Sequence, residues 1–136
     1  MKRILTVLGI VTLVAWVAIA NLHRGSSVGM RRSGSATLVR NMRNALIAYS
    51  NDYNEFPGGD YAQVCRALFG ENPQKQKYIE TSTKGVNAVG EIVDQWGTPL
   101  RVNLSPHPHA PRVQSAGKNR VFEPSSEDSD DIYSWE

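Results

Sequence analysis

The sequence predicts an α+β fold, in which an N-terminal apolar helix and a long amphipathic helix pack on a small antiparallel β-sheet. Three observations predict this fold class. Apolar residues recur with helical spacing between residues 38 and 53. A second, short helix is framed by capping signals between residues 60 and 70, and residues 100–104 alternate as they do in a strand. With 136 residues, the chain accommodates one small domain and an N-terminal extension.

Residues 1–23 are predicted to be a membrane anchor or a signal segment. Lys2 and Arg3 precede an uncharged, mostly apolar stretch, Ile4–Leu22, which as a helix approaches the roughly 30 Å of a bilayer's hydrocarbon core. Ala18-Ile19-Ala20 also fits the A-x-A cleavage site of a secretory signal peptide. We therefore expect a single-pass inner-membrane protein whose globular domain lies outside the cytoplasm, or a secreted or periplasmic protein cleaved near Ala20.

Residues 24–34, rich in Gly and Ser, are predicted to be a flexible tether, and the globular domain is expected over 35–136. The long helix of this domain is predicted from a single apolar stripe, formed by Leu38, Met42, Ala45, Leu46, Tyr49 and Tyr53. Asn54 and the run FPGG that begins at Phe56 are expected to end it.

Capping and turn residues organise the rest of the domain. Asp60 and Gln63 form a capping-box pattern for a short helix that should stop at Gly70. Residues 71–90 are polar and are expected to be mostly loop. A turn with Gly97 should lead into a strand around residues 100–104, and residues 112–115 are expected to pair with it.

Composition argues against several functional classes. The net charge is only +2, and the bases of the first 51 residues are not interleaved with the stacking aromatics that a nucleic-acid interface requires. Catalytic motifs such as G-x-S-x-G, H-E-x-x-H and a phosphate-binding loop are absent from the sequence, so we expect neither an enzyme nor a small-molecule substrate. The single cysteine, Cys65, precludes an intramolecular disulfide and is expected to be buried.

The end of the chain poses an electrostatic problem. Four acids crowd together directly before the apolar stretch Ile-Tyr-Ser-Trp, at Glu127, Asp128, Asp130 and Asp131. The charges should repel one another, although Tyr133 and Trp135, which follow them, are suited to packing. Trp96 and Trp135 are expected to lie in the core or to cover the sheet. Three arrangements could resolve the repulsion among the acids: a bound cation, salt bridges to the nearby bases Lys118 and Arg120, or a loop that stays solvated.

Three motifs in order resemble the globular domain of the major pseudopilin of type II secretion systems, over about residues 44–135. They are "NALIAYSNDYNEFP", "VDQWGTPLRV" and "SAG" followed by "SDDIYSW". The resemblance implies a pilin-like fold and a calcium-binding C-terminal loop. It implies metal ligands at Asp130 and Asp131, whereas Asn119 stands where the family usually has an Asp, and Glu123 and Asp128 are possible substitutes. Gln95 likewise replaces the family's usual proline.

The N-terminus departs from the pseudopilin pattern. The family has a leader that ends in Gly, followed five residues later by a Glu that guides filament assembly. Here Gly9 is followed five residues later by Val14, and the apolar segment has no acid. The resemblance implies a structural subunit or accessory of a type II secretion or type IV pilus-like machine, anchored in the membrane by residues 4–22. Its partners would be like subunits or other secretion-machine proteins. The alternative is a non-polymerising binding domain, membrane-tethered or secreted, that uses the same fold.

Overall fold

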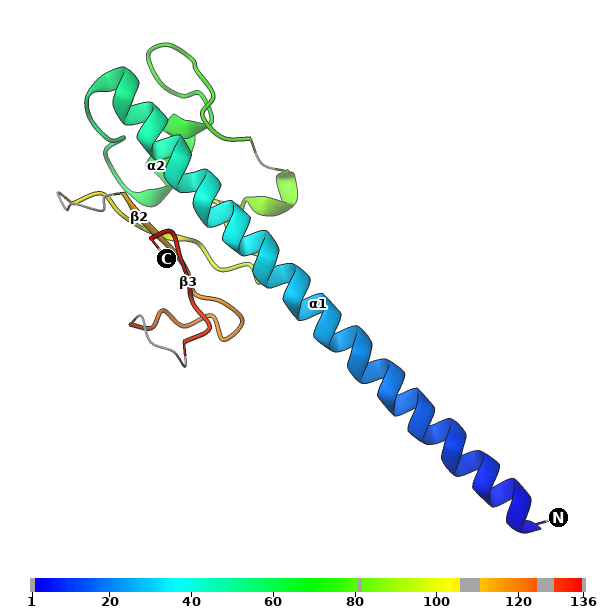
Figure 1. Cartoon of the computed structure of the whole chain (residues 1–136). Coiled ribbons are helices and arrows are strands. Elements are labelled where there is room, and N and C mark those ends of the chain that lie inside the picture. Colours follow the sequence, from blue (N-terminus) through cyan, green and yellow to red (C-terminus); the bar gives the residue numbers. More distant parts are fainter. Residues whose placement is uncertain (1, 81, 106–110, 125–128, 136) are drawn as a thin grey trace. The chain divides into compact units, whose positions relative to one another are not determined.

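Within its described residues, the chain forms an α+β structure with two α-helices and a three-stranded antiparallel sheet, as the sequence predicts (Figure 1). The computed structural model describes residues 2–80, 82–105, 111–124 and 129–135, and it describes side chains from residue 27 onward. Two compact units are present, residues 1–31 and residues 32–136, and each is described separately.

The first unit is the N-terminal part of helix α1, which spans Lys2–Tyr53. Within the described part of the chain, the structure contains no helix that is both long enough and apolar enough to cross a membrane. The structure does not describe the side chains of residues 4–22, so the predicted anchor stays a prediction.

The predicted flexible tether at residues 24–34 is instead helical and continues α1. Gly and Ser are tolerated inside a helix at about 1 kcal/mol or less each relative to Ala, and the segment has no proline to end it. The small residues also serve packing within the second unit. A methyl group on Gly34 would lie 3.2 Å from the side chain of Gln95, and Ser35 is fully buried. The small residue at Gly34, which contributed to the prediction of a flexible tether, instead allows close packing on a helix.

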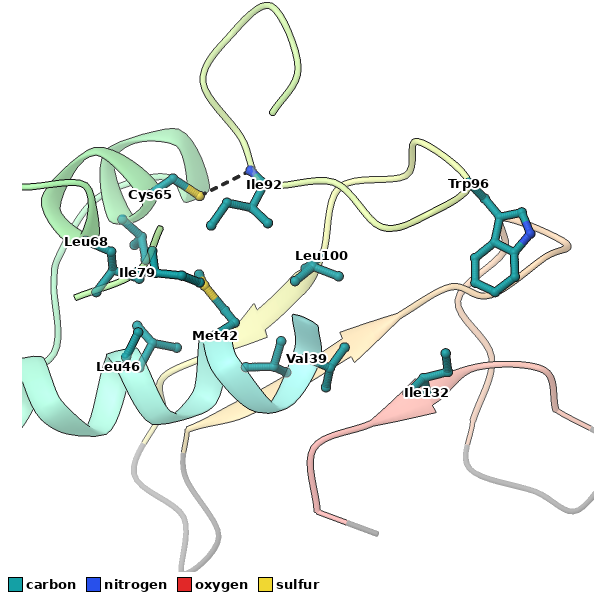
Figure 2. Close-up of a cluster of buried hydrophobic side chains, with 13 residues drawn as sticks. Val39, Met42, Leu46, Cys65, Leu68, Ile79, Ile92, Trp96, Leu100 and Ile132 are labelled. Carbon is teal, nitrogen blue, oxygen red and sulfur yellow. Dashed lines mark hydrogen bonds between the residues drawn. The ribbon is translucent and has the colours of Figure 1, made fainter. Parts of the chain in front are cut away.

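The buried face of α1 carries the core of the second unit. Val39, Met42 and Leu46 are fully buried and point from α1 toward the side chains of α2 and the sheet (Figure 2). Their spacing of three and four residues confirms the predicted stripe. At its N-terminal end the fully buried residue is Val39, and the predicted Leu38 is only partly buried. Opposite them lie buried side chains from α2, the following loops and the sheet, namely Val64, Cys65, Leu68, Ile79, Ile92, Trp96, Leu100, Val113 and Ile132. The expectation that Trp96 packs in the core or over the sheet is confirmed, since it lies in the core.

Helix α2, Tyr61–Leu68, forms as its capping pattern predicts. The backbone N–H of Gln63 donates to Asp60 Oδ1 at 2.8 Å, and the backbone N–H of Asp60 donates to Gln63 Oε1 at 2.8 Å. This reciprocal capping box satisfies donors that the first helical turn would otherwise leave open. The helix ends at Leu68 with Phe69 as its C-cap, and Gly70 follows with φ +111°, a conformation that favours glycine.

The sheet has the strand order β1-β2-β3, with β1 at Arg101–Asn103, β2 at Arg112–Ser115 and β3 at Ile132–Tyr133. Val102 pairs with Val113 between β1 and β2, and Ser115 pairs with Ile132 between β2 and β3. The strands at 101–103 and 112–115 match the predicted positions. The sequence does not predict β3, which is too short for a periodic pattern. A 3₁₀ turn at Thr83–Gly85 is the only regular helix or strand in the described residues between 71 and 90.

The turn at residues 94–98 joins the sheet to α1. Asp94 is 4% exposed, and its Oδ1 accepts hydrogen bonds from the backbone N–H groups of Trp96 and Thr98, both at 2.9 Å. Its Oδ2 accepts from the Ser115 hydroxyl at 2.7 Å. The backbone N–H of Gln95 donates to Ser35 Oγ at 3.1 Å. A single buried carboxylate therefore fixes the turn against the end of β2, and the adjoining amide fixes it against α1.

Cys65 is buried, as expected, on the core face of α2. Its Sγ accepts a hydrogen bond from the backbone N–H of Ile92 at 3.5 Å (Figure 2). Burial raises the pKa of the Cys65 thiol because a thiolate would lose its hydration. Thiols react as thiolates, so both inaccessibility and the raised pKa should make this group inert.

We predict that the Cys65 thiol in the folded chain reacts with Ellman's reagent at pH 8 about 100-fold or more slowly than in the chain unfolded in guanidinium chloride. A C65A/S33C double variant provides the control, because Ser33 is exposed on α1 and the introduced thiol should react quickly. A native Cys65 that reacts as fast as the introduced thiol would contradict the packing described here.

Candidate cation site

The turn after β2 brings the chain back toward β3. Residues 117–120 form consecutive turns, with positive φ at Gly117 (+64°) and Arg120 (+61°). Gly117 is closely packed, since a Cβ at this position would lie 2.3 Å from the carbonyl oxygen of Asp130. Only glycine combines this backbone conformation with this approach. The turn therefore sets Glu123 and the segment before β3 side by side.

Three carboxylates converge at this point. Oxygen atoms of Glu123, Asp130 and Asp131 all lie within 4.8 Å of one another. Asp131 is 2% exposed, whereas Glu123 and Asp130 are half-buried. Three carboxylates at this separation repel one another strongly when all are ionised, and partial burial increases the repulsion.

Backbone amides hold one oxygen of each aspartate. The backbone N–H of Asn119 donates to Asp130 Oδ2, and the backbone N–H of Glu123 donates to Asp131 Oδ2, both at 2.9 Å. Gln114 Nε2 also donates to Asp131 Oδ2 and, at 3.0 Å, to the carbonyl oxygen of Glu123. These bonds fix the orientation of both carboxylates from the loop and from β2.

The second oxygen of each aspartate has a different environment. Asp130 Oδ1 and Asp131 Oδ1 are buried, and no donor among the described residues bonds to either atom. A buried carboxylate oxygen without a donor costs about 1–3 kcal/mol or more. Buried, unsatisfied carboxylate oxygens close to a third carboxylate are suited to binding a hard cation through oxygen.

Lys118 and Arg120, the bases that could neutralise these acids in place of a bound cation, do not pair with them within the described residues. Lys118 and Arg120 are exposed, and neither forms a salt bridge with Glu123, Asp130 or Asp131. Arg32 is a base that does reach this segment, because its Nη1 donates to the backbone carbonyl oxygen of Asp130 at 3.2 Å. That bond reaches the main chain and not a carboxylate.

The structure brings together three of the five predicted metal ligands, Glu123, Asp130 and Asp131. Asn119 contributes its backbone N–H to Asp130, while its side-chain Oδ1 accepts from the backbone N–H of Val121 at 2.7 Å. Asp128 lies outside the described residues, as does Glu127.

Sequence reasoning missed two residues that organise this site, Gln114 and Arg32. Gln114 is 7% exposed and holds both the Asp131 carboxylate and the Glu123 carbonyl. The available signal was its place in the predicted strand 112–115, where a buried amide needs partners. Arg32 lies in the segment that was expected to be a flexible tether, and nothing in its neighbourhood in the sequence indicated a role at the C-terminal loop.

Comparison with family models, with curated proteins and with solved structures finds no match for this chain.

We predict that Gly117→Ala destabilises the chain markedly more than Gly90→Ala. Both glycines have positive φ, +64° and +90°, but only Gly117 has a backbone atom within contact of an added Cβ. Backbone strain alone should cost about 1–2 kcal/mol at each site, and the clash with the Asp130 carbonyl should add to it at Gly117. Urea unfolding of both variants measures the difference, and equal losses would mean that the loop can move away from β3 at little cost.

Proposed function

We propose that this chain is a membrane-anchored, pilin-like structural subunit or accessory of a type II secretion or type IV pilus-like machine. In this role a calcium ion pins its C-terminal loop. One observation carries the calcium part of the proposal. Asp131 is almost fully buried and lies close to two further carboxylates, yet no described donor forms a hydrogen bond to its Oδ1. Calcium takes six to eight oxygen ligands and so suits such a group.

The residues that would hold the ion are Glu123, Asp130 and Asp131. Asp130 and Asp131 would contribute the oxygens that lack donors, and the amide bonds to their other oxygens would preserve the geometry of the loop. The cation would offset the repulsion among the three carboxylates, so that β3 can stay paired with β2. The ion would have a structural role, and we propose no catalytic one.

The architecture is consistent with the role of a pilin-like subunit. Residues 32–53 of α1 pack on a small antiparallel sheet, and the sequence carries the three pseudopilin-like motifs. In such a subunit the apolar segment 4–22 would be embedded in the inner membrane and would pack against like subunits or other proteins of the machine. The globular domain would lie outside the cytoplasm.

A second candidate is a non-polymerising binding domain, tethered or secreted, with the same fold. The absence of any acid from Ile4–Leu22 favours it, because a pseudopilin has a Glu there to guide assembly. The two candidates share the loop site and differ in what the N-terminal segment does. Calcium binding therefore cannot distinguish them, and a separate test of the N-terminus is needed.

For the cation site, we predict that Ca²⁺ raises the Tm of the full-length chain by several degrees relative to EDTA. Saturation at about 100 times Kd corresponds to about 2.7 kcal/mol. Asp131→Asn should abolish this gain. In EDTA, the same substitution should leave the Tm unchanged or raise it, since it removes one of three mutually repelling charges.

Glu55→Gln is the matched control for the change in charge, because Glu55 is exposed and outside the cluster. This variant should keep the full calcium response. Calcium-independent melting of the native chain would contradict the proposed ion, and a calcium response that survives Asp131→Asn would place the ion elsewhere.

For the N-terminus, we predict that the native chain is found in the membrane fraction of the cells that produce it, either at full length or cleaved after Gly9. Intact-mass measurement on separated membrane and soluble fractions distinguishes the outcomes. A soluble chain that begins at Asn21 would lack the anchor and would contradict the subunit role in favour of the exported binding domain.

A further inference from the structure

The outer face of the sheet carries polar and aromatic side chains. Because side chains alternate along a strand, Val102, Val113 and Ile132 face the core while their neighbours face outward. The outward residues are Arg101, Asn103, Arg112, Gln114 and Tyr133, and they line a hollow of about 430 Å³ together with residues that include Phe122 and Trp135. The sequence did not predict a binding surface on this face of the sheet.

The guanidinium group of Arg101 is presented on an aromatic surface. Its Cζ lies 4.0 Å from the centroid of the Phe122 ring, and Arg112 Cζ lies 5.2 Å from the centroid of the Trp135 ring. Arg101 is exposed, and no carboxylate among the described residues forms a salt bridge with it. Stacking holds the planar group in place while its N–H edge can still donate to a carboxylate.

The two arginines are close enough to act on one ligand. In the β1–β2 register Arg101 pairs with Gln114, and Arg112 pairs with Asn103. Arg101 and Arg112 are therefore diagonal neighbours on the same face, a relation that typically separates Cβ atoms by about 7 Å. Two cationic groups at this spacing beside aromatic rings favour an anionic side chain as the ligand.

β1 is also an edge strand. It pairs with β2 on one side, and no described strand pairs with its other side. A second hollow, of about 440 Å³, borders the same strand and is lined by Tyr61, Val64, Val102 and Leu104 among others. Both hollows include Arg101 and Asn103, so they flank β1.

We propose that the edge of β1 binds an extended segment of another protein in which acidic side chains alternate with apolar ones. Main-chain hydrogen bonds to an edge strand provide affinity in this mode, and alternate side chains enter different pockets. The acidic side chains would reach Arg101 and Arg112 on the outer face, and the apolar ones would fill the hollow beside Tyr61 and Val64.

Charge favours such a partner over a second copy of this chain. Pairing β1 with the same strand of another molecule would bring together two segments of sequence Arg-Val-Asn, which contain a cation and no acid. Like charges across paired strands are destabilising.

The test uses the full-length chain in detergent micelles and two fluorescein-labelled peptides, G-V-E-V-E-V-G and its glutamine counterpart G-V-Q-V-Q-V-G. Fluorescence anisotropy should show saturable binding of the glutamate peptide and at least about ten-fold weaker binding of the glutamine peptide. Arg101→Gln should weaken binding of the glutamate peptide about ten-fold or more. Hydrogen exchange measured by mass spectrometry should show slower exchange of residues 101–103 with the peptide bound.

Arg40→Gln is the matched control, since Arg40 is exposed on α1, lines neither hollow and carries the same charge. It should bind the glutamate peptide as the native chain does. The proposal is overturned by a lack of saturable binding up to millimolar peptide, by equal binding of the two peptides, or by equal losses in the Arg40 and Arg101 variants. Tighter, Arg101-dependent binding of a dT oligonucleotide would also overturn it, as would Arg101-dependent dimerisation seen by light scattering.

Discussion

The globular unit depends on how the buried carboxylate of Asp94 is satisfied. Its two oxygens accept from two backbone amides of its own turn and from the Ser115 hydroxyl, so neither oxygen lacks a donor. The adjacent Gln95 amide reaches Ser35 on α1. Helix, turn and sheet are thereby held together by short polar contacts inside an otherwise apolar core. Because Ser115 ends β2, these contacts also determine where the chain leaves the sheet, and hence where the acidic loop begins.

Elements that depend on local signals could be predicted from the sequence, whereas those that depend on distant contacts could not. The capping box of α2 involves Asp60 and Gln63, and the strand around residues 100–104 was predicted from its own alternation. β3 is a strand only because β2 lies beside it, and Gln114 reaches a carboxylate 17 residues away. The segment at 24–34 shows a different limit, because small residues suit both a flexible linker and a closely packed helix. Three of the five candidate ligands converge. Asp130 and Asp131 were predicted from the resemblance to the pseudopilin loop, and Glu123 was predicted as a substitute carboxylate.

The acidic loop and the outer face of the sheet share the same structural elements. Gln114 lines the hollow and also donates to the carbonyl of Glu123, and the hydroxyl of Tyr133 donates to that same carbonyl at 2.9 Å. Phe122, which supports Arg101, is the residue before Glu123. A change in the loop would therefore alter the wall against which Arg101 stacks. The stability of the loop and the shape of the sheet surface are physically connected through three neighbouring side chains.

The burial of Cys65 has a consequence for the chain's covalent state. With a single cysteine in the sequence, any disulfide would have to join two molecules or capture a small thiol. The sulfur of Cys65 is buried between α2 and the backbone at Ile92, so thiol–disulfide exchange requires the domain to open first. In an oxidising compartment, a folded population at high local concentration would thus remain non-covalent. Adventitious dimers would form only from molecules that had not finished folding.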